Sequence, residues 1–121
     1  MNFEKIVDDI ILTSDLIRFV MIINEEGKPV HSKITTTSYL LRSEHASLLA
    51  MDMQILRKLL KLYDESIGEN TSVHLVRRQV HVLIFYVKEW IVMISCDRTA
   101  DRKTVAEISD KIEKIIGKDF E

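Results

Sequence analysis

Three glycines divide this chain into stretches of clear hydrophobic period. The sequence contains only Gly27, Gly68 and Gly117, and each follows a stretch whose apolar residues recur with the period of a strand or a helix. Because glycine is favoured in tight turns and just after helices, these positions predict where elements end. The predicted order is helix, hairpin, long helix, three-stranded meander and helix, in a single domain over residues 1–121.

Changes of period along the chain give the predicted bounds of each element. The strands are predicted at Ile17–Ile23, Pro29–Ile34, Ser72–Arg77, Val80–Val87 and Trp90–Asp97. The helices are predicted from an Asn2 cap to about Leu12, from Ser43 to Ile67 and from about Arg102 to Ile116, with Thr35 to Leu41 as a loop. Gly68 and Gly117 are expected to end the second and third helices.

Strand composition predicts the order of the sheet. Both alternating sets of side chains are apolar or aromatic in the strands that begin at Ile17, Val80 and Trp90, so these strands are expected to be covered on both faces. The strands that begin at Pro29 and Ser72 alternate with polar residues and belong at the edges. Since strands joined by a hairpin pair with each other, we expect an α+β fold with one five-stranded antiparallel sheet in the order 2-1-5-4-3. The long helix is expected on one face and the other two helices on the opposite face.

The long helix carries more apolar surface than one sheet requires. One stripe, at alternating steps of four and three residues, is expected to face the sheet: Leu49, Met53, Leu56, Leu60, Tyr63 and Ile67. A second stripe lies about 120° away around the helix: Leu48, Met51, Ile55, Leu59 and Leu62. An exposed apolar surface of this size is typical of an interface, so we expect a partner to cover it. The alternative is a broad face that the first loop and a curled sheet cover within one chain.

The third strand is a second predicted contact with another copy of the chain. Its core, Val73, His74, Leu75 and Val76, has few of the features that prevent pairing at a sheet edge. A two-fold axis through this edge would also bring the two long helices side by side. The sequence therefore predicts a dimer interface made of these four residues and the second stripe.

The polar arc of the long helix is a candidate surface for a different partner. Arg57, Lys58 and Lys61 lie within about 100° of arc, and a two-fold axis would gather them with their copies. Such a group of cations suits an acidic partner and speeds encounter. The alternative is a solvated face on which Asp64 and Glu65 offset the charge.

The sequence predicts no catalytic, metal-binding or cofactor-binding site. The four histidines lie on different predicted elements without the spacing of a metal site, and Cys96 is expected to be a buried core residue. Gly27 stands alone and forms no phosphate-binding loop. We therefore expect a protein that is not an enzyme and needs no cofactor.

Charge and cysteine content limit the class of partner and the compartment. The 17 basic and 19 acidic residues are interspersed, and the formal net charge is -2. This balance does not favour nucleic acid or an anionic membrane as a partner. The single Cys96 and the lack of a signal-peptide pattern predict a cytoplasmic protein.

The order of elements and one segment resemble the Roadblock family of dynein-light-chain and GTPase-regulator domains. The segment from Leu16 to Ile34, LIRFVMIINEEGKPVHSKI, is similar to that family's first strand, glycine turn and second strand. The family usually has small residues before the first strand and an aspartate in the turn, whereas this chain has Asp15 and Leu16 before the strand and Asn24 at its end. The leading helix distinguishes the predicted layout from the related longin fold.

The resemblance implies a non-enzymatic scaffold or regulator of a small Ras-like GTPase. It implies a dimer, formed by two identical chains or by a chain and its paralogue, that is joined through the third strand and the long helix. The alternative is a small-molecule-sensing domain of the PAS or profilin type, with a ligand pocket between the sheet and the long helix. The first hypothesis needs an occupied two-fold interface, whereas the second needs a cavity and tolerates a monomer.

Overall fold

The computed structural model describes residues 1–35 and 43–120, so nearly all of the loop predicted for Thr35 to Leu41 lies outside the described residues. In chain order the elements are α1 (Phe3–Ile11), β1 (Ile17–Ile23), β2 (Pro29–Ile34), α2 (Ser43–Leu60), the 3-10 turn η1 (Lys61–Tyr63), α3 (Asp64–Ile67), β3 (Ser72–Val76), β4 (Val80–Val87), β5 (Trp90–Asp97) and α4 (Arg102–Asp119). All five predicted strands are present, and only β3 differs from its predicted bounds, because it ends one residue earlier.

The strands form one antiparallel sheet in the predicted order, β2-β1-β5-β4-β3. β1 and β5 are far apart in sequence but pair along their whole length at the centre, for example Val20 opposite Ile94. The β1–β2 turn is closed by Asn24, whose side-chain oxygen accepts hydrogen bonds from the backbone N–H groups of Glu26 and Lys28. β2 and β3 are the two edges of the sheet, as the polar alternation in both strands predicts.

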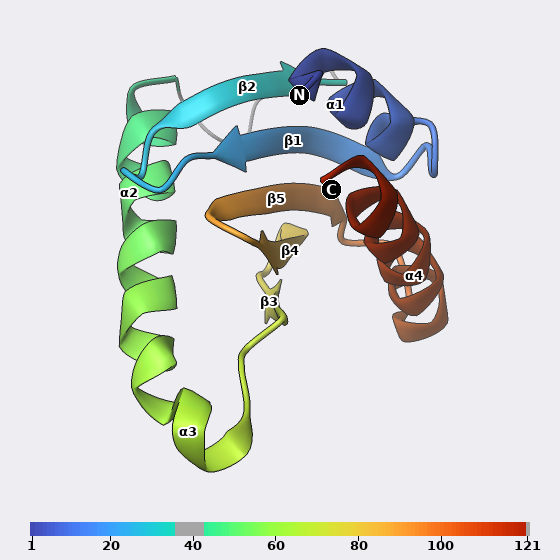
Figure 1. Ribbon diagram of the computed structural model, residues 1–121. Helices are drawn as coiled ribbons and strands as arrows, with labels where there is room; N and C mark the ends of the chain where they lie inside the picture. Colours follow the sequence, from blue (N-terminus) through green and yellow to red (C-terminus); the bar gives the residue numbers. More distant parts are fainter. Residues whose placement is uncertain (36–42, 121) are drawn as a thin grey trace.

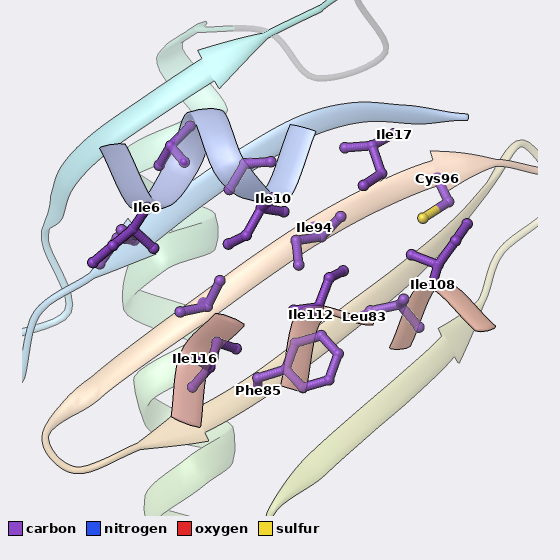
Figure 2. Packing of buried hydrophobic residues seen from close by; sticks show 14 of the residues in the cluster. Ile6, Ile10, Ile17, Leu83, Phe85, Ile94, Cys96, Ile108, Ile112 and Ile116 are labelled. Atoms are coloured by element: carbon purple, nitrogen blue, oxygen red, sulfur yellow. The ribbon is translucent and has the colours of Figure 1, made fainter. Parts of the chain in front are cut away.

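Helices α1 and α4 cover one face of the sheet and α2 lies against the other, which confirms the predicted layers (Figure 1). The larger core lies under α1 and α4, where isoleucines of both helices pack on β1, β4 and β5 (Figure 2). Ile10 of α1, Ile94 of β5 and Ile112 of α4 are fully buried there. Burying one such side chain stabilises the fold by about 1.5–3 kcal/mol, so this core anchors the sheet to both helices.

The last helix is longer than the sequence predicts. α4 continues to Asp119, so the prediction that Gly117 ends it is wrong. A glycine inside a helix costs about 1 kcal/mol relative to alanine. The extra turn brings Phe120 into the core at 2% exposure, and the backbone N–H of Phe120 bonds the carbonyl oxygen of Ile116 at 3.1 Å. Burial of a phenylalanine outweighs the cost of the glycine.

The predicted long helix is helical throughout but changes pitch near its end, where α2 passes through η1 into α3. Gly68 ends α3 with φ at +89°, as predicted. The stripe expected to face the sheet does so only in part. Met53 of α2 is buried against the sheet. Tyr63 and Ile67 are instead 57% and 84% exposed, so the prediction that the whole stripe faces the sheet is wrong for its end. The smaller core ends near Met53, and the helix continues past it, away from the sheet (Figure 1).

Candidate protein-interaction surface

Five apolar side chains of α2 and η1 lie on the surface of the protein. Their exposed fractions run from 49% for Ile55 to 76% for Leu62. We call them the apolar stripe: Leu48, Met51, Ile55, Leu59 and Leu62. This is the second stripe of the sequence prediction, and among the described residues nothing covers it. The protein therefore presents a continuous apolar row, which is the usual mark of a contact surface.

The rotation of α2 that turns this stripe outward is fixed by contacts with the β1–β2 turn. Gln54 is only 6% exposed, and its Nε2 donates to the carbonyl oxygen of Asn24 at 2.8 Å. Gly27 lies so close to the helix that a Cβ there would be 3.2 Å from the Cα of Met51. Gly27 also has φ at +79°, so the turn favours glycine, and a side chain there would press against the helix backbone. Sequence reasoning missed Gln54, although a glutamine beside Met53 on the sheet side of the helix is a visible signal.

Arg57 attaches α2 to the β4–β5 turn. Its guanidinium donates to the carbonyl oxygens of Trp90, at 3.2 Å, and of Lys88. The same group lies 4.9 Å from the centre of the Tyr86 ring. Lys88 has φ at +53°, a left-handed conformation that is uncommon for a residue with a side chain. Arg57 therefore stabilises a strained turn on the sheet.

This position of Arg57 corrects the predicted arc of three cations. Lys58 and Lys61 are exposed, as expected, whereas Arg57 is half-buried and bonded within its own chain. A long side chain at the border between polar arc and sheet can turn either way, and here backbone carbonyls attract it. The solvent-facing part of the arc is reduced to the two lysines.

β3 leaves a row of backbone groups facing outward at the edge of the sheet. The N–H of Arg77 donates to the carbonyl oxygen of Val80. The backbone N–H and C=O groups of Leu75 and Val73, two and four residues earlier, therefore also point toward β4. The alternation places the N–H and C=O groups of Ser72, His74 and Val76 on the outer side. No other strand of the described chain lies there, because β3 is the last strand of the sheet.

The side chains of β3 divide between the two faces of the sheet. Val73 and Leu75 point to the α2 side and are half-buried against the smaller core. His74 and Val76 point to the α4 side and are exposed, with Val76 at 60%. On that side, His74 Nε2 lies 2.9 Å from Nδ1 of His81 on β4. The residues predicted for an interface on β3 are thus incompletely covered on both faces.

A polar groove of about 400 Å³ lies between the end of the long helix and β4. It is lined by Arg57, Lys61, Asp64, Glu69, Asn70, Thr71, Tyr86 and Lys88. The Tyr86 hydroxyl is buried and has no hydrogen-bond partner within residues 1–35 and 43–120. Burial raises the pKa of Tyr86, and the positive charge of Arg57 opposes this rise. The groove lies where the alternative hypothesis requires a pocket, but its lining is charged, whereas small-molecule pockets are mostly apolar.

The described residues give little support to catalysis by the chain itself. Cys96 is fully buried, and burial raises the pKa of its thiol to about 11, so the nucleophilic thiolate is scarce at neutral pH. The part of the chain that the structure describes contains no group of three or more His, Cys, Asp or Glu side chains suited to a metal ion. In the same residues, no helix is both long and apolar enough to cross a membrane.

Solved structures match this arrangement over the whole chain, although their sequences are very different. A Roadblock/LC7 domain from Streptomyces avermitilis matches with a TM-score of 0.71 and 10% identity, covering 100% of both chains. MglB from Myxococcus xanthus matches with a TM-score of 0.75 and 16% identity, covering 99% of this chain and 98% of that one. A profilin from Schizosaccharomyces pombe matches with a TM-score of 0.66 and 12% identity, covering 96% and 98%.

The sequence itself gives no such match: no protein-family model fits it, and no curated protein is similar to it. At identities of 10–16% the structural matches concern the fold alone. The leading helix, the 2-1-5-4-3 sheet and the long helix between hairpin and meander are nevertheless all present. This chain has the Roadblock fold.

Proposed function

We propose that this protein is a non-enzymatic dimeric scaffold or regulator that binds a small Ras-like GTPase. The observation that carries the proposal is an exposed apolar stripe on the same chain as an unpaired sheet edge. Both features need a partner, and one two-fold operation through β3 supplies it for both. The proposed interface consists of Leu48, Met51, Ile55, Leu59, Leu62, Val73, His74, Leu75 and Val76.

A second copy of the chain, or a close paralogue, suits this surface better than an unrelated partner. The outward backbone groups of β3 are complementary to an identical antiparallel strand, because each N–H then meets a C=O. Two apolar stripes brought side by side cover each other without unpaired polar groups. The proposal therefore accounts for the stripe, the edge and the incomplete cover of Val73 and Leu75 by one contact.

The GTPase part of the proposal rests on the resemblance of the segment from Leu16 to Ile34 and on the fold shared with the Roadblock/LC7 domain. Lys58 and Lys61 are the proposed contacts, since both are exposed beside the apolar stripe. In a two-fold dimer their four ammonium groups would form one basic surface for an acidic partner. Arg57, named with them on sequence grounds, contributes by holding α2 in place.

The dimer is tested by sedimentation velocity at micromolar concentrations. Wild-type protein is expected to sediment as a dimer, and Ile55→Glu as a monomer, because two buried carboxylates would face each other without partners. Lys58→Glu changes charge on the same helix but outside the stripe, so it is the matched control and should remain dimeric. A monomeric wild type, or a dimeric Ile55→Glu, would count against the proposed interface.

Partner capture is tested separately with the immobilised dimer and lysate, in GDP and in a non-hydrolysable GTP analogue. Mass spectrometry is expected to find a small GTPase enriched by the wild type and depleted by the double variant Lys58→Glu/Lys61→Glu. Because electrostatic contacts weaken with salt, the capture by wild type should also fall as salt is raised. Equal capture by the double variant would move the site to another face.

The second candidate function is binding of a small molecule in the groove beside Tyr86. The buried hydroxyl without a partner favours it, since a ligand could supply the missing hydrogen bond. Under this alternative a soluble metabolite raises the melting temperature of the wild type but not of Tyr86→Phe. No shift with a metabolite library would leave the dimeric regulator as the sole candidate.

A further inference from the structure

The histidine pair at the β3 edge has a defined arrangement of hydrogens. His81 Nε2 lies 3.0 Å from the carbonyl oxygen of Ala100, which can only accept, so we assign the hydrogen of the neutral ring to Nε2. In the neutral ring, Nδ1 of His81 then has a free lone pair. It accepts the hydrogen of His74 Nε2 across 2.9 Å. This chain of bonds ties β3 to the loop that follows β5, and it is lost if both rings become doubly protonated.

A positive charge lies beside the pair. Arg98 Nη1 is 3.2 Å from Nε2 of His81. Because that nitrogen already gives its hydrogen to Ala100, the guanidinium acts there as a nearby charge and not as a hydrogen-bond partner. The pKa of His74 is lowered by burial, and in addition by the charges of His81 and Arg98.

Among the described residues, no carboxylate is paired with either ring to compensate for this charge. Cys96, opposite His81 on β5, is a neutral thiol, and α4 contributes the apolar side chains Val105 and Ile108 to this face. Asp101 follows Ala100, and its carboxylate accepts a hydrogen bond from the backbone N–H of Thr104 at the start of α4. Within the described residues, neither ring forms an ion pair with a carboxylate. A proton added to the pair therefore gains no direct ion pair with a carboxylate of the described residues.

The geometry of β3 also places His74 beside the proposed two-fold axis. The strand has five residues and His74 is the middle one. Full antiparallel overlap of two copies sets His74 opposite the same residue of the second copy, and the outward groups of Ser72, His74 and Val76 all find partners. A shifted register leaves some of them unpaired. In such a pair the Cα atoms are about 5.5 Å apart and both side chains point to the same face.

We propose that the His74–His81 pair makes the dimer sensitive to pH, so that it forms at neutral and alkaline pH and dissociates when His74 is protonated. This inference rests on the proposed dimer. Protonation would set two imidazolium rings against each other across the axis, each near an Arg98. The dimer therefore binds protons less readily than the separated chains do. Its dissociation constant must rise as the pH falls through the range in which His74 of the free chain is titrated.

The experiment is sedimentation equilibrium of the whole chain at about pH 8 and about pH 5 in buffers of equal ionic strength, with circular dichroism to check the fold. If both chains must hold His74 neutral to associate, the dimer is expected to weaken by more than about threefold at the lower pH. His74→Thr keeps a strand-favouring residue without a titratable group and should respond less than about threefold. His74→Gln is a second variant, in case threonine at the edge impairs pairing.

His31→Gln is the matched control, because His31 lies on β2 at the opposite edge of the sheet and its loss should leave the full response. The inference is overturned if wild-type affinity changes less than about threefold between the two pH values. It is also overturned if His74→Thr and His74→Gln respond as the wild type does. A wild type that is monomeric at about pH 8 would contradict the proposed dimer itself. A dimer whose affinity does not change with pH would contradict only the role of the histidines.

Discussion

Replacement of Arg57 by methionine should destabilise the protein by about 2 kcal/mol. Methionine keeps most of the apolar length of the side chain but removes its charge and its donors. The bond to the part-buried Trp90 carbonyl carries most of the loss, since a bond from a charged donor contributes about 1.5–3 kcal/mol. The exposed Lys88 carbonyl can bond water instead, and the contact with the Tyr86 ring adds about 0.5–1 kcal/mol.

The assay is urea denaturation at about pH 7, followed by the fluorescence of Trp90, which is the only tryptophan and accepts the Arg57 bond itself. All variants must be compared at one protomer concentration, because association would add to the apparent stability. Lys58→Met is the matched control: the same substitution on the next residue of the helix, at an exposed position, should change stability by less than about 0.5 kcal/mol.

Arg57→Lys gives a further check on the reasoning. One ammonium group cannot reach two carbonyl oxygens with the forked geometry of a guanidinium, so this variant should lie between the wild type and Arg57→Met. The role of Arg57 in holding α2 against the sheet would be refuted if Arg57→Met and Lys58→Met were equally stable. It would also be refuted if Arg57→Lys were as stable as the wild type.

Four other substitutions test local features of the fold. Gly117→Ala should stabilise by about 1 kcal/mol in thermal unfolding, because nothing lies within 4 Å of the added Cβ inside α4. Gly27→Ala should instead destabilise by at least about 1 kcal/mol, since its φ is +79° and α2 is close. Cys96→Ser should cost about 1–3 kcal/mol through a buried hydroxyl without a partner, with no effect on partner capture. Asp97 has a pKa of about 2, held low chiefly by the Arg18 hydrogen bond, so its contribution to stability is present above about pH 4 and is lost as the pH falls to about 2. Asp97→Asn should therefore flatten the melting temperature over that pH range.

Strand period predicted the sheet well because burial on one or both faces leaves a direct record in the sequence. β4 and β5 are apolar at nearly every position and lie inside the sheet, whereas the polar positions of β2, such as His31 and Lys33, mark an edge. The same logic separated the two stripes of the long helix. It failed for Tyr63 and Ile67 because period shows which side of a helix is apolar, but not where the sheet beneath it ends.

The interaction surface was predicted less completely, since side-chain directions depend on contacts between distant segments. Whether Arg57 turns to solvent or to the Lys88 carbonyl is decided by packing between segments 31 residues apart. The histidine pair was closer to being predictable from the sequence. The predicted turn between β3 and β4 sets Val76 opposite His81, and His74 shares a face with Val76. The sequence therefore contained enough to place both rings on one face, although the pair was not predicted, while the hydrogen bond between them required the structure.

Gln54 and Arg57 join α2 to two turns of the sheet through polar groups, so the orientation of the helix does not depend on the exposed side chains of the apolar stripe. The residues that hold the helix on the sheet and the residues of the proposed interface are therefore at different positions of the same helix. After a gene duplication, one copy can change Ile55 or Leu59 and still fold. Over evolutionary time the proposed self-complementary surface can come to match only its duplicate, without passing through an ancestor that was unable to fold.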